Sequence, residues 1–204
     1  KQVESRNFQT RKNVLQYDDV MNTQREVIYK QRRQVLDGED LQGSIQNMLH
    51  TMVDSAIRGH MGEQKHMDAE SFREATAPFR TMFLLPGELE LSDEELTNYN
   101  EDQLVELVES KAKERYAAKE QEIGSPLMRE LERVLMLRVV DEYWMDQIDA
   151  MNDLKQGIGL RAYAQTDPVV AYKKEGYEMF EQMVAAIQEE TLRRLRHGME
   201  LLGA

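Results

Sequence analysis

Cysteine is absent from the 204-residue sequence, and glycine (11), proline (4) and aromatic residues (7%) are sparse. The lack of cysteine excludes a disulfide framework, a thiolate zinc site, an iron–sulfur cluster and a cysteine nucleophile. Few glycines and prolines, together with 31% charged and 41% hydrophobic residues, favour long helices over the short strands and frequent turns of sandwiches and barrels. No apolar run approaches the roughly 18 residues of a transmembrane helix. The composition therefore predicts an all-α protein without a membrane span.

The net charge of −12 is unevenly distributed along the chain. Residues 1–36 hold 8 basic and 4 acidic residues, residues 37–123 hold 8 and 20, and residues 124–204 hold 10 and 14. A nucleic-acid-binding protein needs a basic face to displace counterions from phosphates. The acidic middle third argues against such a face, and we expect no nucleic-acid partner.

A long helix is predicted from about Val3 to Leu36, a stretch without glycine or proline. Its inner face is marked by apolar residues that recur every seven positions, namely Val14, Met21, Ile28 and Val35. Gln24 and Gln31 interrupt this stripe, which favours a spine against which other elements pack over a coiled coil. Because the helical pattern already covers Lys1 and no Met precedes it, we expect the chain to be a piece of a longer polypeptide.

The acidic middle third is predicted to be a small helical subdomain. An apolar residue every three or four positions indicates an amphipathic helix over 41–57 and another over about 104–121. Weaker signals indicate a short helix over 69–79. Ser92 and Glu95 have the spacing of a capping box, which predicts a helix start at Asp93.

The last third is predicted to form an antiparallel helical hairpin. Ser125 as N-cap and Pro126 as the first helical residue begin a helix that should run to about Lys155. Gly157 and Gly159 are expected to end this helix, and Asp167-Pro168 should begin the next, which continues to about 196. We expect a loop of about ten residues between the two helices.

The chain shows no recognisable catalytic or metal centre. His60, Glu63, His66 and Glu70 lack the spacing of a helical zinc site, and Gly59 and Gly62 argue against a firm helix there. Glycine-rich phosphate-binding motifs and the nucleophile elbow are absent. The many methionines are interpreted mainly as core residues, at positions 128, 136, 145, 151, 179 and 183, and Trp144 as a scaffold anchor.

Two ordered runs of residues carry a family resemblance. The first comprises Asn7-Phe8, residues 11–22, Gln24-Arg25 and Ile28-Tyr29. The second comprises residues 144–146, 151–158, 160–163, 167–168, 172–177 and 179–180. The first run resembles the opening of the long scaffold helix of the SecA family, the motor ATPases of bacterial preprotein translocation, and the second resembles that family's two-helix finger. Gly159 departs from the family pattern, which usually has His at this position.

The resemblance implies a domain organisation. Residues 1–40 would be the long scaffold helix, 41–123 the helical wing, 124–199 the two-helix finger and the scaffold return helix, and 200–204 the start of a C-terminal linker. In the family, two RecA-like domains hydrolyse ATP with Mg²⁺. None of their motifs lies in this sequence, so we expect this piece alone to need no cofactor and to hydrolyse no ATP.

The resemblance also implies contact residues at the hairpin tip. The family's finger enters the cytoplasmic mouth of the SecY channel, and Tyr163 matches the tyrosine that contacts the translocating polypeptide. Leu160 and Arg161 lie beside it in the sequence. Arg161 could instead meet acidic or carbonyl groups of the channel, and both roles remain open.

The long helix is expected to pack along the nucleotide-binding domains of the same chain. The residues assigned to this docking are Arg11, Tyr17, Asp18, Asp19 and Arg25. The surface that normally docks there would be exposed in the excised piece, so self-association is also expected.

The remaining partners follow from the resemblance. They are the SecY channel complex, unfolded preprotein and, through the whole protein, an anionic membrane surface, with a cytoplasmic location at the inner face of the bacterial plasma membrane. The alternative is a free-standing helical adaptor or coiled-coil protein that acts by homo-oligomerisation. That alternative explains the periodicities equally well, but not the two matching runs.

Overall fold

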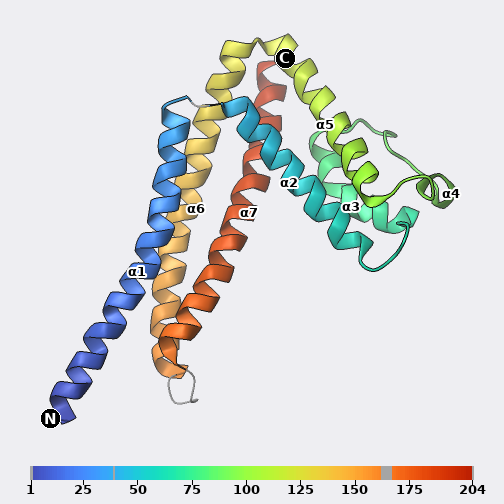
Figure 1. The fold of residues 1–204 in the computed structure, drawn as a ribbon. Helices are drawn as coiled ribbons and strands as arrows, with labels where there is room; N and C mark the ends of the chain where they lie inside the picture. Colours follow the sequence, from blue (N-terminus) through green and yellow to red (C-terminus); the bar gives the residue numbers. More distant parts are fainter. Residues whose placement is uncertain (1, 39, 162–166, 204) are drawn as a thin grey trace. The chain divides into compact units, whose positions relative to one another are not determined.

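The computed structural model describes residues 2–38, 40–161 and 167–203, and over these ranges it contains seven α-helices and no strands (Figure 1). This confirms the all-α prediction. The helices are α1 (Gln2–Leu36), α2 (Leu41–Met61), α3 (Ala69–Met82), α4 (Asp93–Leu96), α5 (Glu101–Ile123), α6 (Ser125–Arg161) and α7 (Pro168–Leu202). In the part of the chain that is described, none of these helices combines the length and apolar character needed to cross a bilayer.

The chain divides into two compact units. The first unit consists of Lys1–Glu39 and Leu137–Ile187, and the second of Asp40–Met136 and Gln188–Ala204. Helices α6 and α7 each contribute to both units, and each unit has a hydrophobic core of its own.

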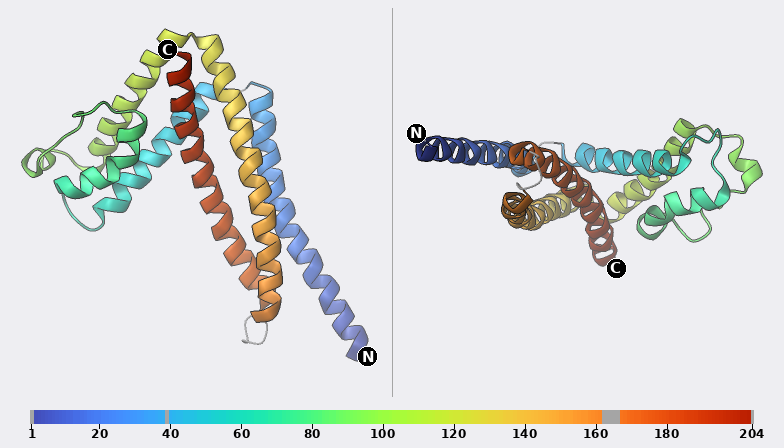
Figure 2. Two further views of the ribbon diagram at one scale, coloured as in Figure 1. Left: turned by 180° about the vertical axis from the view of Figure 1, so that it is seen from behind. Right: turned by 90° about the horizontal axis from the view of Figure 1, so that it is seen from below.

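In the first unit, α1 lies along an antiparallel pair formed by α6 and α7 (Figures 1 and 2). This arrangement confirms that the first helix is a spine. Two apolar clusters hold the three helices together. The proximal cluster is built from Ile28, Val139, Val140, Trp144, Met183 and Ile187. The distal cluster, nearer the hairpin tip, is built from Met151, Leu154, Ile158 and Tyr172.

The core assignments of Trp144 and most of the methionines are confirmed. Trp144 is buried. The buried methionines include Met128, Met136, Met151 and Met183. Met145 is an exception, because its side chain is 67% exposed.

The predicted end of α6 near Lys155 is wrong. The helix continues through Gly157 and Gly159 and ends at Arg161. A glycine inside a helix costs only about 1 kcal/mol relative to alanine, and Ile158 between the two glycines is fully buried in the distal cluster. Packing against the hairpin therefore outweighs the local preference of the glycines. The start of α7 at Pro168 is confirmed, and Asp167 Oδ1 accepts a hydrogen bond from Val169 N at 2.9 Å.

In the second unit, α2 packs against α3 and α5. The faces that meet are lined by buried residues spaced three or four apart, among them Leu49, Val53, Ile57, Phe72, Phe79, Leu104 and Val108. The helix over 69–79 is longer than predicted and reaches Met82. Gly59 lies within α2, so it does not break the helix there as predicted.

Side-chain caps define the helix starts of the second unit. The capping box of Ser92 and Glu95 is present as predicted. Asn100 and Gln103 form another, which sequence reasoning missed although the spacing is the same. Its signal was available, because Asn is as good an N-cap as Ser.

Candidate functional surfaces

The hairpin tip projects beyond the last buried layer of the first unit. Ile158 is the final buried residue of α6, and the helix then makes one more turn into solvent. Leu160 on that turn is 79% exposed, the highest value among the exposed large apolar residues of the described chain. The predicted contact residue Tyr163 lies outside the described residues.

Arg161 ties the end of α6 to α7. Its Nη1 atom donates a hydrogen bond to Glu175 Oε1 at 2.6 Å, and both side chains remain partly exposed. Exposed ion pairs of this kind contribute little to stability, about 0–1 kcal/mol. The pair therefore orients the guanidinium without burying it.

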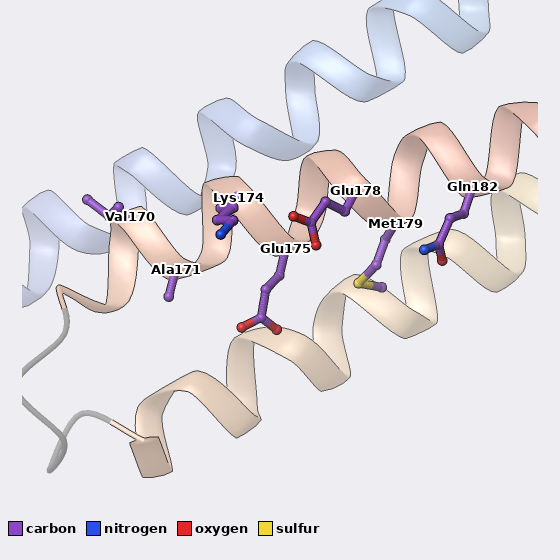
Figure 3. Close-up of a pocket in the computed structure, with 7 residues that line it drawn as sticks. All are labelled: Val170, Ala171, Lys174, Glu175, Glu178, Met179 and Gln182. Atoms are coloured by element: carbon purple, nitrogen blue, oxygen red, sulfur yellow. The ribbon is translucent and has the colours of Figure 1, made fainter. Parts of the chain in front are cut away.

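A shallow trough of about 580 Å³ follows the tip-proximal half of α7. Figure 3 shows Glu175, Met179 and Gln182 pointing toward α6 and Val170 pointing away from it. The lining residues are Val170, Ala171, Lys174, Glu175, Glu178, Met179 and Gln182. Both signs of charge and some apolar surface occur together along the trough.

The outer face of α1 carries a second apolar stripe with a seven-residue period, which Asn22 interrupts. Its members are all exposed, namely Phe8, Leu15, Tyr29 and Leu36. Residues 2–12 are exposed throughout, so the first turns of α1 bury no side chain within the described chain. Exposed apolar residues in such a row are typical of a surface that another protein covers.

The residues predicted to dock on motor domains divide into two groups. Arg11, Asp18 and Asp19 are exposed, and Arg25 is half-buried and donates to Asn22 Oδ1 at 2.8 Å. Tyr17 instead faces the hairpin and packs against the distal cluster.

Tyr17 is part of a small aromatic and charged group within the first unit. Its ring meets the Tyr172 ring edge to face, with centroids 4.7 Å apart, and Lys155 Nζ lies 5.6 Å from its centroid. Burial and then the nearby charge of Asp167 raise the pKa of Tyr17 above its ordinary value. Tyr17 therefore has a packing role inside this chain.

A groove of about 580 Å³ lies between α1 and α6 in the first unit. Buried Ile28 and Trp144 form part of its lining, together with exposed Tyr29, Leu36 and Met145. On its rim, Arg32 Nε donates to Asp141 Oδ1 at 2.9 Å, which links the two helices. The groove continues the outer apolar stripe of α1.

The second unit contains a buried carboxyl group, Glu132 of α6. Arg129 Nη2 donates to Glu132 Oε1 at 3.0 Å and to the Tyr116 hydroxyl at 3.0 Å, and it also lies 3.1 Å from Glu120 Oε1. Arg129 Nε is 2.8 Å from Glu132 Oε2, but neither atom has a hydrogen-bond partner. Burial and then the charge of Asp40 raise the pKa of Glu132 to about 8.

This cluster is better explained by packing than by catalysis. Glu132 is completely buried and lines neither the trough nor the α1–α6 groove. Across the described ranges, no group of three or more His, Asp or Glu side chains is placed to hold a metal ion. The geometry thus points to protein contact surfaces as the functional features.

The chain consists of a long helix packed on a helical hairpin, and of a smaller helical unit whose helices lie mostly between them in the sequence. This architecture defines a helical scaffold protein. The family model described as SecA Wing and Scaffold domain matches residues 1–198. The chain belongs to this family.

Curated relatives named protein translocase subunit SecA agree with this assignment. The chain is 49% identical over 198 residues to that of Caldicellulosiruptor saccharolyticus and 50% identical over 198 residues to that of Clostridium acetobutylicum, in each case covering 97% of this chain and 23% of the relative. The protein of Heliobacterium modesticaldum is 46% identical over 193 residues, which cover 95% of this chain and 22% of the relative. The chain therefore spans less than a quarter of the length of these relatives.

Proposed function

We propose that this chain is the part of a SecA translocase motor that connects the ATP-hydrolysing domains to a finger in contact with the translocating polypeptide. One observation carries the proposal. The spine helix and the hairpin share the two apolar clusters of the first unit, and this packing would carry a displacement of α1 to the tip. On this proposal, residues 1–40 are the scaffold helix, 41–123 the wing and 124–199 the finger and return helix.

The hairpin tip is the proposed contact with preprotein and with the SecY channel. Leu160 offers exposed apolar surface and Arg161 an exposed guanidinium, which together suit contact with many unrelated chains. Tyr163 is assigned to the same contact from its place in the sequence. The channel lies in the bacterial plasma membrane, so the proposed location is the cytoplasmic face of that membrane.

Photocrosslinking in the complete translocase tests the tip. A photoreactive residue replaces Tyr163 in one variant and the exposed Asp146 of α6 in a control variant, with a preprotein stalled in the channel. We expect crosslinks to preprotein or channel from position 163 and few from position 146. Crosslinks from position 163 only to a second copy of the chain would contradict the proposal and favour the homo-oligomeric adaptor.

The outer face of α1 is the proposed docking surface for the nucleotide-binding domains. The exposed stripe through Phe8 and Leu15, flanked by Arg11, Asp18 and Asp19, supplies the apolar centre and charged rim of an interface. Replacing Phe8 and Leu15 together by Ser should weaken binding of this chain to a separately produced fragment that holds those domains. Glu26→Ser, at another exposed position of α1, is the control, and equal binding by all variants would refute this docking face.

A further inference from the structure

Two buried polar side chains lie where the proximal and distal clusters of the first unit meet. Among the described residues of that unit, Gln24 of α1 and Gln147 of α6 are the polar side chains that are buried. Along α1, Gln24 lies between Val20 of the distal cluster and Ile28 of the proximal cluster. Along α6, Gln147 lies between Trp144 and Met151 in the same way.

The two glutamines bond to each other and to α7. Gln147 Nε2 donates to Gln24 Oε1 at 3.1 Å, and Gln24 Nε2 donates to the Gly176 carbonyl oxygen at 3.2 Å. Gly176 also lies between cluster residues, Tyr172 on one side and Met183 on the other. One polar layer therefore connects all three helices at a single level.

At this layer, α7 lies close to α1 and α6. A Cβ atom on Gly176 would lie 2.7 Å from Met151 Cε and 3.8 Å from Gln24 Nε2. The first contact would displace the end of the Met151 side chain, and the second is an ordinary van der Waals distance. The absence of a side chain at Gly176 thus lets Met151 and the Gln24 amide lie against the main chain of α7.

Apolar packing alone would distinguish poorly between neighbouring registers of α1. Met21 and Ile28, one turn to either side of Gln24, are apolar and similar in size to glutamine. A shift of one helical turn, about 5.4 Å, would bring one of these apolar residues into the place of Gln24. It would, however, leave the Gln24 and Gln147 amides buried without partners, which is strongly unfavourable.

We propose that the Gln24–Gln147–Gly176 layer is a register lock that fixes the axial position of α1 against the hairpin. Buried polar groups can specify register at some expense of stability, as a single buried Asn does in coiled coils. The lock explains why polar residues are retained in the centre of the longest apolar interface of this unit. It is a property of the fold and does not depend on the proposed role in transport.

The test replaces both glutamines by methionine, which has a similar shape and no amide. Spin labels on cysteines introduced at exposed Lys30 and Asp146 report the axial position of α1 relative to α6, and the cysteine-free sequence makes this labelling specific. The matched control is Gln31→Met, because Gln31 interrupts the same stripe but is exposed.

We expect a single narrow distance for the unmodified chain and for Gln31→Met. In the Gln24→Met/Gln147→Met variant, a second population should appear that is displaced by about 5 Å, one helical turn, with a melting temperature equal to or above that of the parent. One narrow and unchanged distance in this variant would overturn the proposal. Loss of helical circular dichroism would also overturn it, because the layer would then be needed for stability rather than for register.

Discussion

At the level of a single residue, burial of Glu132 should make the stability of the second unit depend on pH. Its pKa is about 8 in the folded chain, against an ordinary value of 4.5. The folded state therefore holds a proton that the unfolded state has lost between these two values. Stability from this group is fully present below pH 4.5 and decreases as the pH rises through about 8.

Glu132→Gln should remove this pH dependence. One proton changes the free energy of unfolding by at most about 1.4 kcal/mol per pH unit. We expect the variant to match the parent near pH 5 and to be more stable near pH 9, measured by urea unfolding at a series of pH values. Glu130→Gln, on the exposed side of the same helix, is the control, and equal profiles for parent and Glu132→Gln would contradict the assignment.

Two helical glycines should respond oppositely to alanine. At Gly157, an added Cβ meets nothing within 4 Å, so Gly157→Ala should stabilise the chain by about 0.5–1 kcal/mol through helix propensity. At Gly176, the same change pushes the buried Met151 side chain aside, and overpacking costs about 1–3 kcal/mol. Thermal unfolding of both variants gives the comparison, and equal stabilisation by both would show that Met151 repacks freely.

At the level of elements, local signals predicted helix starts better than helix ends. Ser92 and Asp167 could be read as caps because an N-cap bond forms within one turn of the chain. The end of α6 could not be predicted in this way. Gly157 and Gly159 favour a helix end near these positions, but the helix continues because Ile158 is buried in the distal cluster. Tertiary packing decides such cases.

For the candidate surfaces, too, the sequence predicted the placement of some residues and not of others. Leu160 and Arg161 were predicted from the sequence as contact residues; both are exposed, and their contact role stays a prediction. Tyr17 was assigned an outward role, but its orientation depends on the partner ring of Tyr172, which is distant in sequence. Gln24 was interpreted as an interruption of the apolar stripe, because its partners Gln147 and Gly176 lie on other helices.

The capping box at the start of α5 should stabilise that single helix. Asn100 Oδ1 accepts from Gln103 N at 2.8 Å, and Gln103 Oε1 accepts from Asn100 N at 2.9 Å. Asn100→Ala should lower the free energy of unfolding by about 1 kcal/mol, measured by chemical denaturation. Asn98→Ala, two residues earlier and exposed, should have little effect, and an equal loss in both variants would contradict a specific role for the box.

At the level of the whole molecule, the division into two units separates two kinds of surface. The first unit presents the tip and the outer face of α1, both with exposed apolar side chains. The second unit has a strongly acidic sequence and holds its helix starts with side-chain caps. We therefore expect the surface substitutions proposed for the first unit to change binding without changing the unfolding of the second.

Hydrogen exchange in the first turns of α1 can report whether another domain covers them. Residues 2–12 are helical but bury no side chain within the described chain, and a helical segment of about 12 residues without tertiary contacts frays in water. Backbone amides there should exchange with deuterium quickly in the isolated chain, while those near Ile28 exchange slowly. Slow exchange of residues 2–12 in a longer protein would then report, amide by amide, that another domain covers this end of the helix.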